Sequence, residues 1–123
     1  MTHTMWCEVT VAQKSQFLKG CARTLVLKVL SEKPMYGYEI AAQLSERTAN
    51  VFELGQGTLY PMLYSLEKQG LIRVERESKA PGTARKRLYY GVTAKGRAAL
   101  REDSETWSTI SRGMRLVLGD AHA

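Results

Sequence analysis

The sequence predicts a mainly helical α+β fold, in which three helices precede a two-stranded hairpin and one long helix follows it. Three observations indicate this order. Apolar residues recur with a helical period through the first half of the chain, the period changes to two across residues 72–92, and a helical period returns after Thr93. With 123 residues, 44% of them apolar, the chain has the size and composition of one globular domain.

Residues 1–12 show no clear period, and we expect them to form a mobile lead-in. A first helix is predicted over about Lys14–Ser31, because one apolar stripe runs along it. The members of this stripe are Phe17, Leu18, Cys21, Leu25 and Val29, widened by Val26 and Leu30. Pro34 separates the first helix from a second one, "YGYEIAAQLSER" (36–47). The inward face of the second helix consists of Ile40, Ala41 and Leu44.

The residues "TANVFELGQG" (48–57) predict a loop with a short extended piece, since three of them are large and apolar. A third helix follows, with Thr58 as its N-cap and Pro61 at the third helical position, where the missing N–H would have no partner in any case. Gly70 suits the C-cap, and Leu71 supplies the apolar contact that often accompanies it. The core stripe of this helix is Leu59, Met62, Leu63 and Leu66.

The opposite face of the third helix carries Thr58, Tyr60, Tyr64 and Ser65, where a helix that is merely soluble would carry Glu and Lys. Such a face is typical of a contact surface. A proline near its start removes an N–H donor, so a partner can approach the helix tip closely. Partial burial of the two tyrosines against the second helix is the alternative.

An alternation with period two predicts the hairpin. The inward residues are Ile72, Val74, Leu88, Tyr90 and Val92, and the outward residues are Arg73, Glu75, Arg87 and Tyr89. Between the two strands, Pro81 and Gly82 fit positions i+1 and i+2 of a type II turn.

The positive charge of the chain is concentrated in and just after this hairpin. The net charge is +6, but residues 73–101 contain nine basic and two acidic residues, which leaves +7 there and −1 elsewhere. This distribution favours nucleic acid or another anionic partner. A hairpin that is simply solvated is the alternative.

Three helices followed by a hairpin form the winged helix-turn-helix arrangement. In that arrangement the third helix enters the major groove of DNA and the hairpin, or wing, reaches phosphates beside it. Residues 13–92 are therefore predicted to form a DNA-binding domain. Lys68 on the third helix and the wing residues Lys79 and Lys86 are candidate contacts for phosphates.

The last helix is predicted to begin after Thr93, a good N-cap, and to run to about Leu118, before Gly119. Five of six seam positions in its heptad pattern are apolar, which predicts that residues 93–119 form a dimerisation helix. The exception is Asp103. The predicted dimer contacts are Leu100, Trp107, Ile110, Met114 and Val117.

Three segments, "MYGYEIAAQL", "GTLYPMLYSLEKQGLI" and "RKRLYYGVTAKG", resemble the PadR family of bacterial transcriptional regulators, and the likeness covers about residues 17–118. It implies a dimeric repressor of operator DNA, and a single final helix resembles the short subfamily. By position, the resemblance assigns DNA contact to Tyr36, Thr58, Tyr60, Pro61 and Tyr64, and to the wing residues Arg85 and Arg87. The wing departs from the family pattern at Lys86 and Leu88.

The resemblance also implies a role for Trp107, which lies in "ETWSTI". In short members of the family, tryptophans from both subunits near this position can flank a space for flat aromatic compounds. We therefore expect a small aromatic effector whose binding alters the spacing of the two DNA-reading helices. Packing of Trp107 in the dimer seam, with no effector, is the alternative.

Signals for other classes of protein are weak. The only histidines, His3 and His122, lie near the two ends, so neither a histidine-based catalytic site nor a metal site is expected, and "GQG" (55–57) lacks the pattern of a nucleotide-binding loop. Cys7 and Cys21 form no metal or disulfide pattern, and we interpret Cys21 as a reduced core thiol.

The sequence contains neither a signal peptide nor a transmembrane run, so we expect a cytoplasmic protein that is not an enzyme and has no cofactor. A winged-helix module that binds ligands or proteins without reading an operator is the alternative function.

Overall fold

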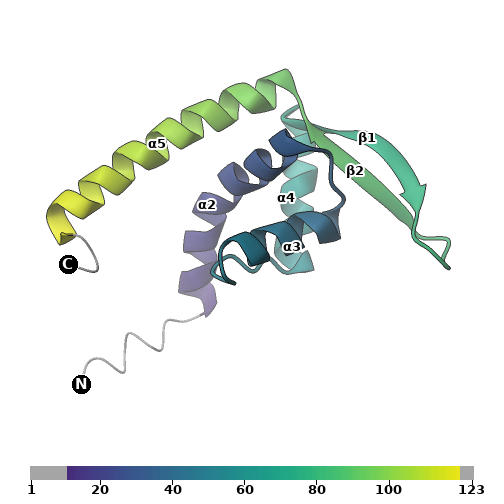
Figure 1. Cartoon of the computed structure of the whole chain (residues 1–123), viewed down its shortest axis with the longest axis horizontal. Coiled ribbons are helices and arrows are strands. Elements are labelled where there is room, and N and C mark those ends of the chain that lie inside the picture. The colour runs from purple at the N-terminus through teal and green to yellow at the C-terminus, as the bar shows by residue number, and fades with distance from the viewer. Residues whose placement is uncertain (1–10, 120–123) are drawn as a thin grey trace.

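The computed structural model describes residues 11–119, which form four helices and a two-stranded antiparallel sheet. The elements are α2 (Val11–Glu32), α3 (Gly37–Arg47), α4 (Gln56–Lys68), β1 (Ile72–Lys79), β2 (Lys86–Val92) and α5 (Ala94–Leu118). The hairpin projects to one side of the clustered α2, α3 and α4, and α5 extends to the other side (Figure 1). The predicted fold class is confirmed. The predicted lead-in, residues 1–12, lies almost entirely outside the described residues.

The hydrophobic core lies where α2, α3 and α4 meet the base of the hairpin. Its fully buried members include Val26, Leu27, Leu30, Met35, Ile40, Leu59, Leu63 and Ile72. The predicted stripe of α2 is wrong in detail, because Cys21 and Leu25 are only half-buried whereas Ala22 and Leu27 are buried. The reason is that α2 packs against α3, β2 and α5 at once, so more than one of its faces is covered.

Helix α4 begins earlier than predicted, with Gly55 rather than Thr58 as its N-cap. The carbonyl oxygen of Gly55 accepts hydrogen bonds from the backbone N–H groups of Thr58 and Leu59, at 3.0 and 2.9 Å. Pro61 is therefore the sixth residue of the helix, and it leaves the carbonyl of Gly57 without its usual helical N–H partner. Propensity placed the cap at a threonine, but a glycine in an extended conformation serves instead.

The C-terminal end of α4 agrees with the prediction. Gly70 has a φ of +78°, and the N–H of Leu71 reaches back to the carbonyl of Leu66 at 3.0 Å. This hydrogen bond and the bond from Gly70 to Glu67 form a Schellman motif. The chain therefore leaves the helix directly into β1.

The loop between α3 and α4 contains no strand among residues 48–55, and Gly55 at its end has an extended backbone. Ala49 and Asn50 both have positive φ, and the Asn50 N–H bonds to the carbonyl of Ser45 at 2.8 Å. Leu54 is buried and Phe52 half-buried, so these apolar residues of the loop anchor the tight turn.

The hairpin has the predicted turn and an extra partner. Gly82 has a φ of +73°, and the Thr83 N–H donates to the Ala80 carbonyl at 3.2 Å, as a type II turn requires. At the base, Met35 exchanges two backbone hydrogen bonds with Tyr90, at 3.1 and 2.9 Å. Met35 thus forms an isolated antiparallel bridge to β2. This bridge ties the start of α3 to β2.

Tyr89 was predicted to point outward, but it is buried. The register of the sheet shifts between Val74 and Arg76, so β1 carries an irregularity opposite this part of β2. The ring of Tyr89 is then covered on the outer side by Tyr36 and Arg76. Strict alternation fails here because side chains from neighbouring segments cover the outer face.

Helix α5 starts as predicted, and its first turn is fixed to the end of α4. The Thr93 hydroxyl accepts the Gly96 N–H at 3.0 Å and donates to the Gly70 carbonyl at 2.6 Å. The Thr93 N–H bonds to the carbonyl of Leu71 at 3.0 Å, and Lys95 Nζ donates to the carbonyl of Gln69 at 2.9 Å. We call these contacts the α4–α5 junction.

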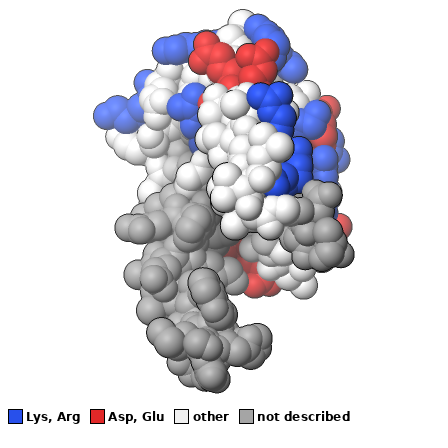
Figure 2. All heavy atoms as spheres, turned by 90° about the vertical axis from the view of Figure 1, so that its left-hand side faces the viewer, with Lys and Arg blue, Asp and Glu red and all other residues white. Residues whose placement is uncertain are grey.

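The second half of α5 extends beyond the core and ends at Gly119, whose φ is +79°. Its large exposed apolar side chains are Trp107, Ile110, Met114, Leu116, Val117 and Leu118. Figure 2, seen from this side of the molecule, shows a broad uncharged area bordered by Lys, Arg and acidic side chains. A helix with so much uncovered apolar surface is unusual for a monomer.

Replacement of Gly96 by alanine should destabilise the fold by about 2 kcal/mol or more, because overpacking of this kind is costly. The added Cβ would overlap the carbonyl oxygen of Leu71 and approach Val92 Cγ2 to 2.6 Å. Denaturant unfolding followed by circular dichroism measures the change. In the control Gly20→Ala, the new Cβ has nothing within 4 Å, and stability should rise by up to about 1 kcal/mol. Equal stability of both variants would contradict the tight packing of the junction.

Candidate nucleic-acid interface

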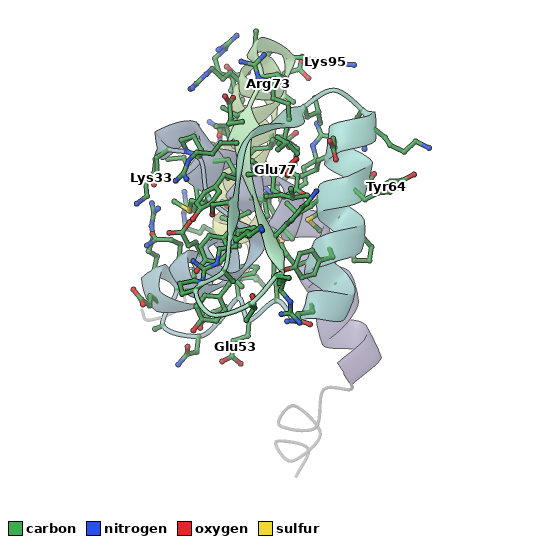
Figure 3. All side chains as sticks on the ribbon, turned by 90° about the vertical axis from the view of Figure 1, so that its right-hand side faces the viewer. Lys33, Glu53, Tyr64, Arg73, Glu77 and Lys95 are labelled. Carbon is green, nitrogen blue, oxygen red and sulfur yellow. The ribbon has the colours of Figure 1, made fainter. Side chains whose placement is uncertain are left out.

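The exposed face of α4 carries the tyrosines singled out in the sequence. Tyr60 and Tyr64 are 47% and 63% exposed, so they are not locked inside the fold. Figure 3 looks onto the hairpin and shows Tyr64 pointing outward from α4, while the hairpin runs beside this helix. Thr58 is half-buried and Pro61 is exposed on the same helix. The face is therefore available to a partner.

A cleft of about 390 Å³ lies between α4 and the wing. It is bounded by the start of α3, the first turns of α4 and the distal half of the hairpin. Its lining residues are Tyr36, Gly37, Tyr38, Gln56, Tyr60, Ala80, Arg85, Lys86, Arg87 and Leu88. The structure thus brings five predicted site residues, from three separate segments, to one concave surface: Tyr36, Tyr60, Arg85, Lys86 and Arg87.

The other predicted DNA-contacting residues lie outside the cleft. The Lys68 ammonium stands 5.5 Å from the centre of the Tyr64 ring, one turn along α4, so these two side chains form an exposed pair. Lys79 is exposed at the far end of β1. Together with the cleft, they give a surface that runs from the end of α4 to the wing tip.

Two lysines lie side by side near the wing tip. Lys79 and Lys86 are opposite each other in the register of the sheet, an arrangement that costs stability unless an anion lies nearby. Acidic neighbours compensate only in part: Glu77 Oε1 lies 3.6 Å from Lys86 Nζ, and both side chains are exposed. Arg73 forms a similar pair with Glu75, at 3.1 Å. Exposed pairs of this kind contribute little to stability, so the cations stay available to a partner.

Two arginines of the wing lie over aromatic rings. The Arg87 guanidinium is 4.6 Å from the centre of the Tyr36 ring, and that of Arg76 is 3.7 Å from the centre of the Tyr89 ring. Tyr36 and Tyr89 meet edge to face, with ring centres 5.3 Å apart. Tyr36 and Arg87 are both only half-exposed, in contrast to Arg85 and Lys86.

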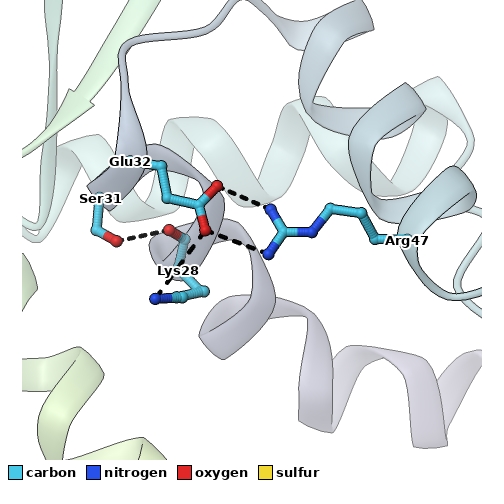
Figure 4. Close-up of polar contacts among 4 residues, drawn as sticks. All are labelled: Lys28, Ser31, Glu32 and Arg47. Carbon is cyan, nitrogen blue, oxygen red and sulfur yellow. Dashed lines mark hydrogen bonds and ion pairs between the residues drawn. The ribbon is translucent and has the colours of Figure 1, made fainter.

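Helix α3, which forms one wall of the cleft, is fixed to α2 by an ion pair. Figure 4 shows the Arg47 guanidinium donating two hydrogen bonds to the Glu32 carboxylate, at 2.8 and 3.2 Å, with Lys28 at 4.0 Å from the same group. The hydrogen bonds from Arg47 lower the pKa of Glu32 below its usual value, and the positive charges act in the same direction. This pair holds the far end of α3 while the Met35–Tyr90 bridge holds its start.

Sequence reasoning missed five of the residues that line the cleft: Gly37, Tyr38, Gln56, Ala80 and Leu88. Gln56 lies in the first turn of α4, and the misplaced N-cap had left it outside the helix. Gly37 provides space for Tyr60, since a Cβ at this position would lie 2.6 Å from the Tyr60 hydroxyl. Tyr38 stacks beside Tyr36, with ring centres 6.4 Å apart, and is 72% exposed. The sequence signal for Tyr38 was its position, because this large side chain falls outside the apolar period of the second helix.

The predicted dimer residues do not share one environment. Leu100 packs against the core of its own chain. Asp103 is tied to α2, because the Arg23 Nε and Thr24 hydroxyl groups donate to its carboxylate at 3.0 and 3.2 Å. Among the predicted dimer residues, the exposed fraction is 38% at Trp107 and increases along the helix to 85% at Val117. The first half of the seam is therefore used within the chain.

Trp107 and Thr24 line two cavities beside α2 and α5. The first, about 440 Å³, is mainly apolar and is lined by Cys21, Thr24, Leu25, Phe52, Ser104 and Trp107. The second, about 340 Å³, is more polar and includes Arg23 and Asp103. Cys21 is thus part of a cavity wall rather than a core thiol, and partial burial raises its pKa, which disfavours the reactive thiolate.

Among residues 11–119, no group of three or more His, Cys, Asp or Glu side chains could hold a metal ion. Within the same range, none of the helices has the length and apolar content that a membrane crossing requires. What the surface does offer is cations, tyrosine rings and hydrogen-bond donors along an exposed helix and an adjacent hairpin. This combination suits binding to a polyanion with a groove.

Comparisons with known proteins agree with this geometry. Residues 26–102 match the transcriptional regulator PadR-like family. Transcriptional regulator Rv3488 of Mycobacterium tuberculosis is 31% identical over 107 residues, which are 87% of this chain and 92% of that protein. A PadR family transcription regulator from Clostridium difficile is 33% identical, with a TM-score of 0.68 over 80% of this chain and 99% of the other. A PadR family regulator from Eggerthella lenta is 27% identical, with a TM-score of 0.74 over 94% and 97%.

Proposed function

The chain belongs to the PadR-like family of transcriptional regulators, and from this premise we propose that it is a homodimeric repressor that occupies operator DNA and is released by a small aromatic effector. Members of this family are transcriptional regulators rather than enzymes, so the predicted family and the prediction of a non-enzymatic, DNA-binding regulator are confirmed. Repression, the dimer and the effector are our proposals, as are the individual contact residues.

The observation that carries the proposal is the single surface shared by α4 and the wing. Tyr60 and Tyr64 would face the major groove, while Lys79, Arg85 and Lys86 would reach phosphates beside it. Lys68 lies at the C-terminal end of α4, where it would meet the backbone at the edge of the groove. Thr58 and Pro61 would form the part of the helix that approaches the bases.

Loss of the wing cations should weaken DNA binding and flatten its salt dependence. Each phosphate contact contributes about 0.9 to the slope of log K against log salt, so Lys79→Ala, Arg85→Ala and Lys86→Ala combined should reduce the slope of a dimer by up to about five. The slope is measured by fluorescence anisotropy at several salt concentrations, with a duplex selected by the wild-type chain. The control, Lys33→Ala with Arg112→Ala and Arg115→Ala, removes the same charge elsewhere and should leave the slope unchanged. Equal slopes for both triple variants would refute the wing assignment.

The proposed dimer rests on the exposed half of α5. Trp107, Ile110, Met114 and Val117 lie on one seam of the helix, and all four are exposed in a single chain. Pairing of this seam with that of a second copy would remove its apolar surface from water. It would also place two α4 helices on one duplex, with half-sites about one helical turn apart.

A charge in the seam should prevent dimer formation. We expect the wild-type chain to sediment at about twice its mass of 13.8 kDa, and the double variant Ile110→Asp/Met114→Asp to sediment as a monomer. In the control, Ser108→Asp places the charge on the outer face of the same helix and should leave the dimer intact. A wild-type monomer at micromolar concentration, or a dimeric double variant, would overturn the proposed seam.

The proposed effector site is the apolar cavity beside Trp107. A flat aromatic compound would lie between Trp107, Leu25 and Phe52, and a partner's seam could complete the enclosure. The α4–α5 junction offers a route to DNA, because a change in the angle of α5 acts directly on Gln69, Gly70 and Leu71 at the end of α4. Movement of α5 would thus change the spacing of the two α4 helices.

Naphthol, as a flat aromatic probe, should quench Trp107 fluorescence in a saturable manner. The chain contains two tryptophans, so Trp6→Phe is introduced first to leave Trp107 as the only reporter. Phe52→Ser should then weaken binding by roughly tenfold, because it removes an aromatic wall of the cavity. Val51→Ser, at an exposed neighbouring position, is the control and should bind as before. Linear, non-saturating quenching in the reporter protein would exclude the site.

A further inference from the structure

The distal part of the wing has few contacts with the rest of the molecule. Between Lys79 and Lys86 only Ala80 is partly covered, and the backbone bridge of Met35 holds the hairpin only at its base, at Tyr90. Between the base and the tip, the hairpin touches the segment before α3 through Arg87 and Tyr89. On its inner face the hairpin is also held by Val74 and Leu88, which pack against the core. On its outer face, the angle of the wing depends on Arg87 and Tyr89 and on the ring that they contact.

What they meet is the ring of Tyr36. One arginine, Arg87, lies over this ring at 4.6 Å, and Tyr89 meets the ring edge to face at 5.3 Å with planes inclined by 66°. The chain of contacts continues to Arg76 on β1, over the ring of Tyr89 at 3.7 Å. We name these four side chains, Arg76, Tyr89, Tyr36 and Arg87, the wing stack. It joins both strands of the hairpin to the N-terminus of α3.

The contacts within the wing stack have preferred angles and can therefore fix the orientation of the wing. A guanidinium is planar and lies flat on an aromatic face, where the quadrupole of the ring attracts its charge. Edge-to-face rings have a preferred angle, so each contact restricts rotation as well as distance. Tyr89 is buried and Tyr36 half-buried, which strengthens these interactions relative to exposed ones.

We infer that Tyr36 is a positioning residue for DNA binding: its ring, through Arg87 and Tyr89, sets the angle of the wing and so the place of the wing cations. Arg87 acts through this ring and is not an independent phosphate contact. The inference rests on the proposed binding of duplex DNA by α4 and the wing, and it changes the role that family resemblance implied for both residues.

The test uses the salt slope, which a merely structural residue would not move. Tyr36→Leu removes no charge, yet it should reduce the slope by more than the value of one phosphate contact, about 0.9. It should also weaken binding about tenfold, because the wing cations are no longer held where they reach the phosphates. Tyr36→Phe keeps the ring, so it should keep the affinity within about twofold and leave the slope unchanged. Tyr60→Leu, which removes an exposed tyrosine of α4 that belongs neither to the stack nor to the Tyr64–Lys68 pair, should weaken binding without a change of slope.

A second pair of variants leaves the ring in place, in case Tyr36→Leu unfolds the domain. Arg87→Lys keeps the charge but loses the flat guanidinium, so the slope should fall; Arg85→Lys, on a wing arginine outside the stack, should not change it. An unchanged slope in both Tyr36→Leu and Arg87→Lys would refute the positioning role. Equal losses in Tyr36→Phe and Tyr36→Leu would show that the hydroxyl contacts DNA directly and would also refute it. If the wild-type chain binds DNA without salt dependence, the proposed function itself falls, and this inference falls with it.

Discussion

The contact on which the rest of the structure depends is that of Thr93 with the turn after α4. One residue closes the sheet through its N–H, caps α5 with its hydroxyl oxygen, and donates the hydroxyl proton to Gly70 at the end of α4. Gly96 allows this arrangement because a side chain there would overlap the Leu71 carbonyl. Three elements therefore meet at one point with little freedom, so the orientation of α5 and that of α4 cannot change independently.

The molecule divides its surface by chemistry on the two sides of this junction. Toward the wing, cations and tyrosine rings predominate, and Lys79 lies opposite Lys86 although the pair repels. Toward the end of α5, exposed apolar side chains predominate. Both features cost stability or solubility in an isolated chain. Each becomes favourable with a partner, a polyanion on one side and an apolar surface on the other, as the proposed dimer on DNA would provide.

Several side chains have roles within the chain that their spacing did not reveal. Asp103 occupies a seam position in the heptad, yet it accepts hydrogen bonds from Arg23 and Thr24 and fastens the first half of α5 to α2. Cys21, expected in the core, lies in the wall of an apolar cavity beside Trp107. In both cases the outcome depends on how α2 and α5 cross, and this crossing has no signature in a single periodic pattern.

The amino-acid sequence by itself determined the order of the elements, the turn at Gly82, the caps at Thr93 and Gly70 and the basic character of the wing. These follow from local rules: hydrophobic period, the conformations open to glycine, capping side chains and net charge. Only the tertiary structure decided that Gly55 caps α4, that Tyr89 is buried and that Tyr36 meets Arg87. The burial of Tyr89 and the contact of Tyr36 with Arg87 depend on residues distant in the chain, because a register shift and a stack of rings arise only when separate segments pack together. The cap at Gly55 is made by local hydrogen bonds from Thr58 and Leu59, and capping preference alone had favoured the threonine.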